Sequence, residues 1–154
     1  MTSHAFSKAL GEDELRLPDR VHRGLIASAR VQYYLTLLQA AKEHAVDLSE
    51  GDLALPAAST IIHGLFAELA VMLHSLRLAA DATPELRPAL ARYALRLARL
   101  HADAPSGVAD RLSAEAIDAL TGDGDGTGDC VRQLTVDLHA ELKRALALIP
   151  TRSS

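Results

Sequence analysis

Residues 56–80, PAASTIIHGLFAELAVMLHSLRLAA, form the longest apolar stretch of this 154-residue chain. At about 100° per residue, the large apolar side chains gather on one side of a helix, which comprises Ile62, Leu65, Phe66, Leu69, Met72, Leu73 and Leu76. The opposite side is small and weakly apolar, and comprises Thr60, His63, Ala67, Ala70, Val71, His74 and Leu78. A helix that is apolar nearly all round is usually buried on more than one side. We therefore predict a central helix that lies between other helices or meets a second chain.

The central stretch is not expected to span a membrane. His63, Glu68 and His74 interrupt it, and an ionised carboxylate near the centre of a bilayer is costly. The N-terminal 20 residues contain neither the basic nor the apolar segment of a secretory signal. The single cysteine, Cys130, excludes an internal disulfide and suits a reducing compartment. We expect a soluble, cytoplasmic protein.

The composition favours a helical protein of one domain. Hydrophobic residues make up 49% of the chain and aromatic residues only 3%, and the abundant Ala and Leu both favour helices. The length suits a single domain over residues 18–150, with a mobile arm over 1–17 and a tail over 151–154. The formal net charge of −4 argues against nucleic-acid binding.

Helix-start signals place further helices around the central one. Pro18 and Asp19 begin a helix that should run to about residue 45. The stretch Thr83-Pro84-Glu85 combines a capping hydroxyl, a proline and a first-turn acid, and should begin another. A short helix is expected over 108–120, and Asp129 is expected to cap a last helix to about residue 149. The predicted fold class is all-α, an antiparallel helical bundle of four main helices plus one short helix.

The helix over residues 19–45 has two adjacent apolar sides. The first comprises Val21, Leu25, Ser28, Val31, Leu35, Leu38 and Ala45. The second comprises Ile26, Ala29, Tyr33, Leu37 and Ala40. So broad an apolar surface predicts packing against two neighbours.

The seven histidines do not follow a metal-binding pattern. The chain contains neither an HExxH motif nor the Glu-x-x-His pair that bundle metal sites use. His63 and His74 share a face but lie about 16 Å apart along the axis, while His139 and Glu141 point away from each other. We expect no metal and no other cofactor, and a metal or haem site assembled from different helices stays an alternative.

The loop over residues 122–128, GDGDGTG, resembles the front of an EF-hand calcium loop, with oxygen ligands at alternate positions followed by a glycine. Leu134 stands where that loop needs its bidentate glutamate. We interpret the loop as a turn and Cys130, which follows it, as structural. The absence of a GxSxG elbow and of a Gly-rich phosphate loop makes an enzyme less probable than a binding protein.

Two sets of residues are candidates for contact with a partner. Arg92, Arg96 and Arg99 line the flank of one helix, where they either receive an acidic partner or phosphate, or form a solvated side. Ala67, Val71 and Leu78, with Thr60, form a side of the central helix that is too apolar to face water comfortably. We expect that side to be a two-fold interface of a homodimer, or to be covered by the first or last helix.

The segment His74-Ser75-Leu76-Arg77-Leu78-Ala79-Ala80 resembles the phosphoacceptor segment of histidine phosphotransfer domains, His-x-Leu-Lys-Gly followed by small residues. The resemblance covers seven residues and implies a four-helix bundle in which His74 attacks a receiver domain's aspartyl phosphate and Arg77 replaces the family's lysine. Leu78 stands where the family has a glycine that lets the receiver approach. We therefore expect His74 to be structural and partly buried against a neighbouring helix or subunit.

These patterns favour a non-enzymatic helical-bundle module that acts through protein–protein interaction in a regulatory or adaptor role. The alternatives are histidine phosphotransfer through His74 and the binding of a small ligand, metal or haem between the helices.

Overall fold

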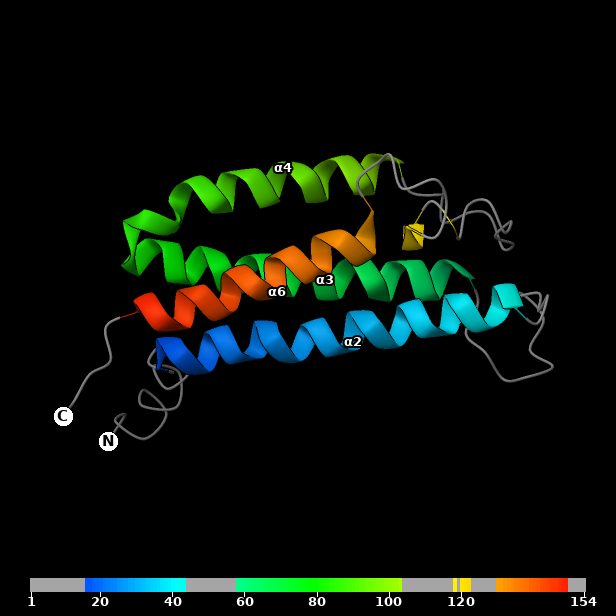
Figure 1. Ribbon diagram of the computed structural model, residues 1–154, viewed down its shortest axis with the longest axis horizontal. Helices are drawn as coiled ribbons and strands as arrows, with labels where there is room; N and C mark the ends of the chain where they lie inside the picture. Colours follow the sequence, from blue (N-terminus) through cyan, green and yellow to red (C-terminus); the bar gives the residue numbers. More distant parts are fainter. Residues whose placement is uncertain (1–15, 44–57, 104–117, 119, 123–129, 150–154) are drawn as a thin grey trace, which may run out of the picture.

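The computed structural model describes residues 16–43, 58–103, 118, 120–122 and 130–149. Four helices carry the fold (Figure 1): α2 (Leu17–Glu43), α3 (Ala58–Ala82), α4 (Arg87–Asp103) and α6 (Val131–Leu148), with a 3₁₀ turn, η2 (Pro84–Leu86), before α4. Residues 1–15 of the predicted N-terminal arm, the connection before α3, the loop over 123–128, most of the short helix over 108–120 and the C-terminal tail lie outside the described residues. Leu17, which was predicted to end the arm, is the first residue of α2.

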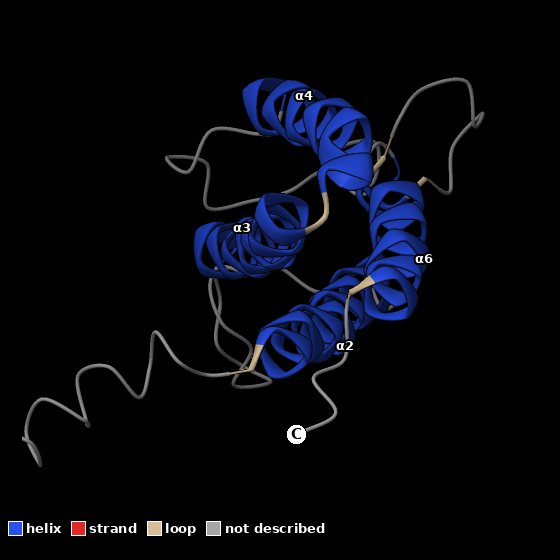
Figure 2. Cartoon of the chain, turned by 90° about the vertical axis from the view of Figure 1, so that its left-hand side faces the viewer, coloured by secondary structure: helices blue, strands red, loops and turns tan. Residues whose placement is uncertain are grey.

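The helices run alternately in opposite directions along one axis (Figure 1). Seen along that axis, α3 and α6 lie on either side of the bundle between α2 and α4 (Figure 2). Helix α2 packs against α3 and α6, α4 packs against the same two helices, and α3 also contacts α6. The structure therefore confirms the predicted all-α antiparallel bundle of four main helices.

The large apolar side of α3 forms the centre of the core. Leu65, Leu69, Met72 and Leu76 are fully buried, which confirms the predicted burial of Leu69 and the predicted core side of this helix. They pack with fully buried leucines and valines of the other helices, namely Val21, Val31, Leu35, Leu38, Leu134, Leu138 and Leu142.

Gly24 lets α2, α3 and α6 meet closely at one level of the bundle. A Cβ atom on Gly24 would lie 2.8 Å from the Cβ of Ser75 and 2.9 Å from the Cδ1 of Leu142. The hydroxyl of Ser75 donates a hydrogen bond of 2.9 Å to the carbonyl oxygen of Arg20, one turn before Gly24. The bond joins a buried side chain of α3 to the backbone of α2 where no larger residue than glycine fits.

Gly64 makes a second close approach between α2 and α3, three turns further along. A Cβ atom on Gly64 would lie 2.5 Å from the Cζ atom of Tyr34. The Tyr34 ring therefore lies against the backbone of α3. The two glycines together hold α2 against α3 along most of their length.

Two helix starts differ from the sequence-based expectation. Thr83 occupies the cap position of η2, but its hydroxyl makes no cap hydrogen bond, and the turn is closed instead by the Leu86 N–H, which donates to the Thr83 carbonyl oxygen at 3.0 Å. At α6 the cap is Cys130 rather than Asp129, because Cys130 has the extended backbone of a cap residue and its Sγ atom accepts from the Gln133 N–H at 3.3 Å.

We predict that Gly24→Ala destabilises the protein, although the same change at an exposed helix position stabilises it by about 1 kcal/mol. The new methyl group would overlap Ser75 and Leu142, so we expect a loss of about 1–3 kcal/mol in the free energy of unfolding measured by urea denaturation. In a double-mutant cycle, Gly24→Ala should cost less in the Ser75→Gly background, where one of the two overlaps is absent, than in the wild-type protein. An unchanged or higher stability of Gly24→Ala would contradict the close packing.

Candidate interaction surfaces on the bundle

Most residues of the second apolar sides of α2 and α3 are exposed to solvent. Ile26 and Tyr33 of α2 are 55% and 61% exposed, and Val71 of α3 is 41% exposed. Ala29 of α2 and Thr60, His63, Ala67, Ala70 and His74 of α3 are also exposed, and Leu78 is half-buried. The expectation that the first or last helix covers this side of α3 is therefore wrong for the described part of the chain.

Helix α2 has two neighbours, as predicted, but both contact the same side of it. Among residues 17–40 of α2, the buried ones all fall in the arc that faces α3 and α6, and comprise Val21, Gly24, Ala27, Ser28, Val31, Leu35 and Leu38. Of the predicted second apolar side, Ile26, Ala29 and Tyr33 are exposed, whereas Leu37 and Ala40 are half-buried and Leu37 packs against the core. A square bundle gives each helix two neighbours at adjacent corners, so its outer side stays uncovered (Figure 2).

The exposed apolar residues of α2 and α3 border one seam. Arg30 Nη1 lies 3.8 Å from Glu68 Oε1 across that seam. Ile26 and Tyr33 lie one turn before and after Arg30, and Val71 lies one turn after Glu68. The Tyr33 ring contacts the Tyr34 ring edge-on, at 5.7 Å between centroids, and Tyr34 packs on Gly64. We call Ile26, Tyr33, Ala67, Val71 and Leu78 the α2–α3 outer face.

His74 lies on the exposed flank of α3, one turn after Ala70. Its side chain is exposed, and so is that of Arg77, one turn further on. The expectation that His74 is partly buried against another helix of the same chain is therefore wrong. The physical reason is that α2 and α4 both lie toward the core side of α3, which leaves the histidine flank uncovered.

The arginine stripe of α4 divides into two kinds of residue. Arg92 and Arg99 are exposed. Arg96 is half-buried: its Nη1 donates to Asp137 Oδ2 at 2.9 Å, and its guanidinium lies 5.5 Å from the centroid of the Tyr93 ring. Arg96 thus joins α4 to α6, which is a structural role that the sequence stripe does not reveal.

Asp137 is held from three directions. In addition to Arg96, Gln133 Nε2 donates to its Oδ1 at 2.8 Å, and the Tyr93 hydroxyl donates to its backbone carbonyl oxygen at 3.4 Å. Together these contacts fix the α4–α6 side of the bundle.

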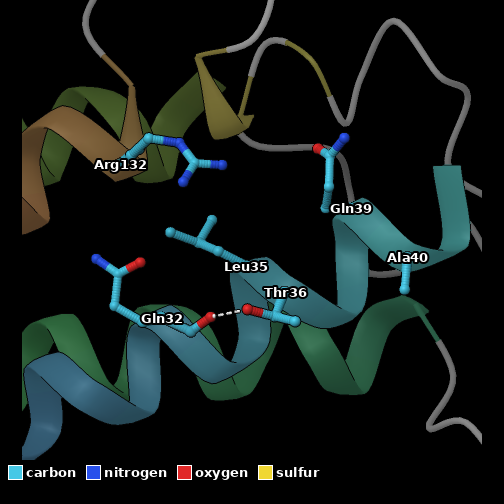
Figure 3. Close-up of a pocket in the computed structure, with 6 residues that line it drawn as sticks. All are labelled: Gln32, Leu35, Thr36, Gln39, Ala40 and Arg132. Carbon is cyan, nitrogen blue, oxygen red and sulfur yellow. Dashed lines mark hydrogen bonds between the residues drawn. The ribbon is translucent and has the colours of Figure 1, made fainter. Parts of the chain in front are cut away.

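A groove between α2 and α6 was not predicted from the sequence. It consists of two adjoining hollows that share Gln32. The larger, of about 370 Å³, is lined further by Leu25, Ser28, Ala29, Thr135, Val136 and His139. The smaller, of about 210 Å³, is lined further by Leu35, Thr36, Gln39, Ala40 and Arg132 (Figure 3). We call the two hollows together the α2–α6 groove.

His139 and Ser28 meet at the floor of the larger hollow, with 3.1 Å between His139 Nδ1 and Ser28 Oγ. Ser28 lies in the middle of α2, where backbone N–H groups are used by the helix, so α2 offers no oxyanion hole beside this hydroxyl. The sequence analysis considered His139 only together with the nearby Glu141. It missed the pair with Ser28, because 111 residues separate Ser28 from His139. The contact is a polar join between α2 and α6.

Two further observations concern metal binding and membrane insertion. Among the described residues, no three His, Cys, Asp or Glu side chains come together as metal ligands would. Within the same residues, the helical stretch Thr60–Ala82 has the length and hydropathy of a membrane span, with 44% of its most apolar window buried in the bundle. The core helix of a water-soluble bundle has the same length and hydropathy, so these properties do not distinguish a membrane-spanning helix from a core helix.

Compared with known proteins, the chain matches no protein-family model, no curated protein and no solved structure. Its function therefore has to be inferred from its own surfaces.

We predict that Arg96→Ala lowers the free energy of unfolding by about 1 kcal/mol, because it removes the bond to Asp137 and the contact with Tyr93. Arg99→Ala is the matched control: it removes an exposed arginine of the same helix and should change stability by less than about 0.5 kcal/mol. Urea denaturation of both variants checks this, and equal effects would remove the distinction between the two arginines.

Proposed function

We propose that this protein is a non-enzymatic, cytoplasmic module that works by binding another protein through the α2–α3 outer face. The observation that carries this proposal is the joint exposure of Ile26, Tyr33 and Val71 beside one seam. Contiguous apolar surface on a small domain marks interaction sites. The single cysteine and the polar residues within α3 support the cytoplasmic location.

The composition of this face matches that of protein interfaces. Tyrosine is enriched among the residues that contribute most to binding, because its ring buries a large area at a low entropy cost. The Arg30–Glu68 pair, His63 and His74 supply polar groups around the apolar residues. An apolar centre with a polar rim is the usual arrangement of such an interface.

A homodimer is the form of the proposal that the spacing on α3 favours. Thr60, Ala67, Val71, His74 and Leu78 recur at intervals of three, four or seven residues, which is the spacing of a helix–helix seam. The small Ala67 near the middle lets two identical helices approach closely. A two-fold axis beside it would cover Val71 of both copies.

We predict that Val71→Glu abolishes dimer formation and leaves the bundle folded, because Val71 is already exposed in the single chain. Leu95→Glu is the matched control, since Leu95 is also a large exposed apolar residue, on α4, with 51% exposure. Light scattering after size exclusion gives the mass, and circular dichroism reports the fold. A wild-type protein that is monomeric at all concentrations, or a Leu95→Glu variant that dissociates as readily, would contradict the homodimer.

Histidine phosphotransfer is the second candidate, and the exposure of His74 favours it. A phosphoacceptor needs a solvent-open imidazole and a nearby cation. Exposed Arg77, one turn away, supplies the cation, and exposed Ala70 leaves room beside the ring. Half-buried Leu78 opposes this function, because it adds bulk where a receiver domain would approach.

For this second candidate, we predict transfer of phosphate from phosphorylated receiver domains of the same organism to wild-type protein and to His63→Gln, but not to His74→Gln. His63 is the matched control, because it is an exposed histidine on the same helix. Acid-labile phosphate on the protein is the measured quantity. Absence of transfer from a broad panel of receivers rejects phosphotransfer and leaves the partner-binding proposal in place.

A further inference from the structure

We infer that the α2–α6 groove binds a medium-chain carboxylate, with the carboxylate at Arg132 and the apolar chain along Val136 and Ala29. This site lies on the α6 side of α2 and does not depend on the α2–α3 outer face.

The smaller hollow has the chemistry of a carboxylate site. Arg132 reaches from α6 over Leu35, and the amides of Gln32 and Gln39 lie on either side of it (Figure 3). Arg132 Nε donates to the Thr121 carbonyl oxygen at 2.9 Å, which holds the guanidinium in place. A guanidinium fork matches a carboxylate in geometry and charge. The hollow also lies at the N-terminal, positive end of α6.

The larger hollow has the chemistry of an apolar-chain site. Its buried polar groups are already hydrogen-bonded within the protein: His139 with Ser28 at 3.1 Å, and the Thr135 hydroxyl with the Val131 carbonyl oxygen at 2.7 Å. The wall that remains is apolar and includes Val136, which is 52% exposed. An apolar chain there would cover this exposed side chain and break no hydrogen bond.

The two hollows are joined in the right order for one amphipathic ligand. They share Gln32, so the two hollows border each other at that residue. Arg132 and His139 are seven residues apart on α6, which is about 10 Å along the helix. A straight, medium-length chain with one charged end fits this layout, whereas a compact polar metabolite would leave the Val136 end empty.

The test is isothermal titration of the full chain with decanoate, below the concentration at which decanoate forms micelles. We expect one molecule bound per chain and no binding of decyltrimethylammonium, which has the same chain and the opposite charge. Gln32→Lys should tighten decanoate binding about two- to fivefold and Gln32→Glu should weaken it by a similar factor. Gln32 is exposed, so neither change should disturb the core.

Two further variants locate the chain and control for net charge. Ala29→Phe fills the larger hollow and should weaken decanoate binding about tenfold. Ala91→Lys and Ala91→Glu place the same charges on an exposed residue of α4 and should leave the affinity unchanged. No binding of decanoate, binding that Gln32 and Ala29 do not affect, or equal effects from Ala91 would each overturn the assignment.

Discussion

The close approach of α2 to α3 is the constraint on which the rest of the structure depends. It exists because Gly24 and Gly64 carry no side chain at the two places where the helices meet Ser75 and Tyr34. Tight contact along one helix pair leaves one side of each helix for the core and turns the opposite side outward. The exposure of Tyr33 and Val71 is thus a consequence of how deeply α2 and α3 pack.

The last helix completes the bundle through polar joins as well as through its leucines. His139 meets Ser28 on the α2 side, and Asp137 meets Arg96 and Tyr93 on the α4 side. The polar groups at the α2–α6 seam and at the α4–α6 seam each have defined partners. Only one rotation of α6 about its own axis therefore allows the contacts at both seams. That rotation is what opens the α2–α6 groove with Val136 at its edge.

The regular part of this fold follows from the sequence, because periodicity of apolar residues identifies a core side without knowledge of neighbours. It identified the buried side of α3, including Leu69, and the antiparallel four-helix bundle. Periodicity does not say how many neighbours a helix has, which is why the exposure of His74 and of Ile26 differed from expectation. The join between Arg96 and Asp137 connects residues 41 positions apart, and no local pattern marks it.

Helix ends and glycines illustrate a second limit of the sequence. Asp129 and Thr83 have the side chains that a cap requires, yet Cys130 caps α6 and the Thr83 hydroxyl caps nothing. The backbone angles at one residue decide which side chain reaches the free N–H groups, and those angles depend on tertiary packing. Gly24 would read as a weak point in a helix, and only its neighbours from α3 and α6 show that it is a point of contact.

Because Cys130 caps α6, the reactivity of its thiol reports on local opening at the start of this helix. Cys130 is buried, its sulfur accepts a hydrogen bond from the Gln133 N–H, and a Cβ atom on Gly122 would lie 2.5 Å from that sulfur. Burial and these close neighbours restrict the approach of an alkylating reagent to the thiol. Chemical labelling must wait until the first turn of α6 separates from Gly122, so its rate measures how often this end of the bundle opens without global unfolding.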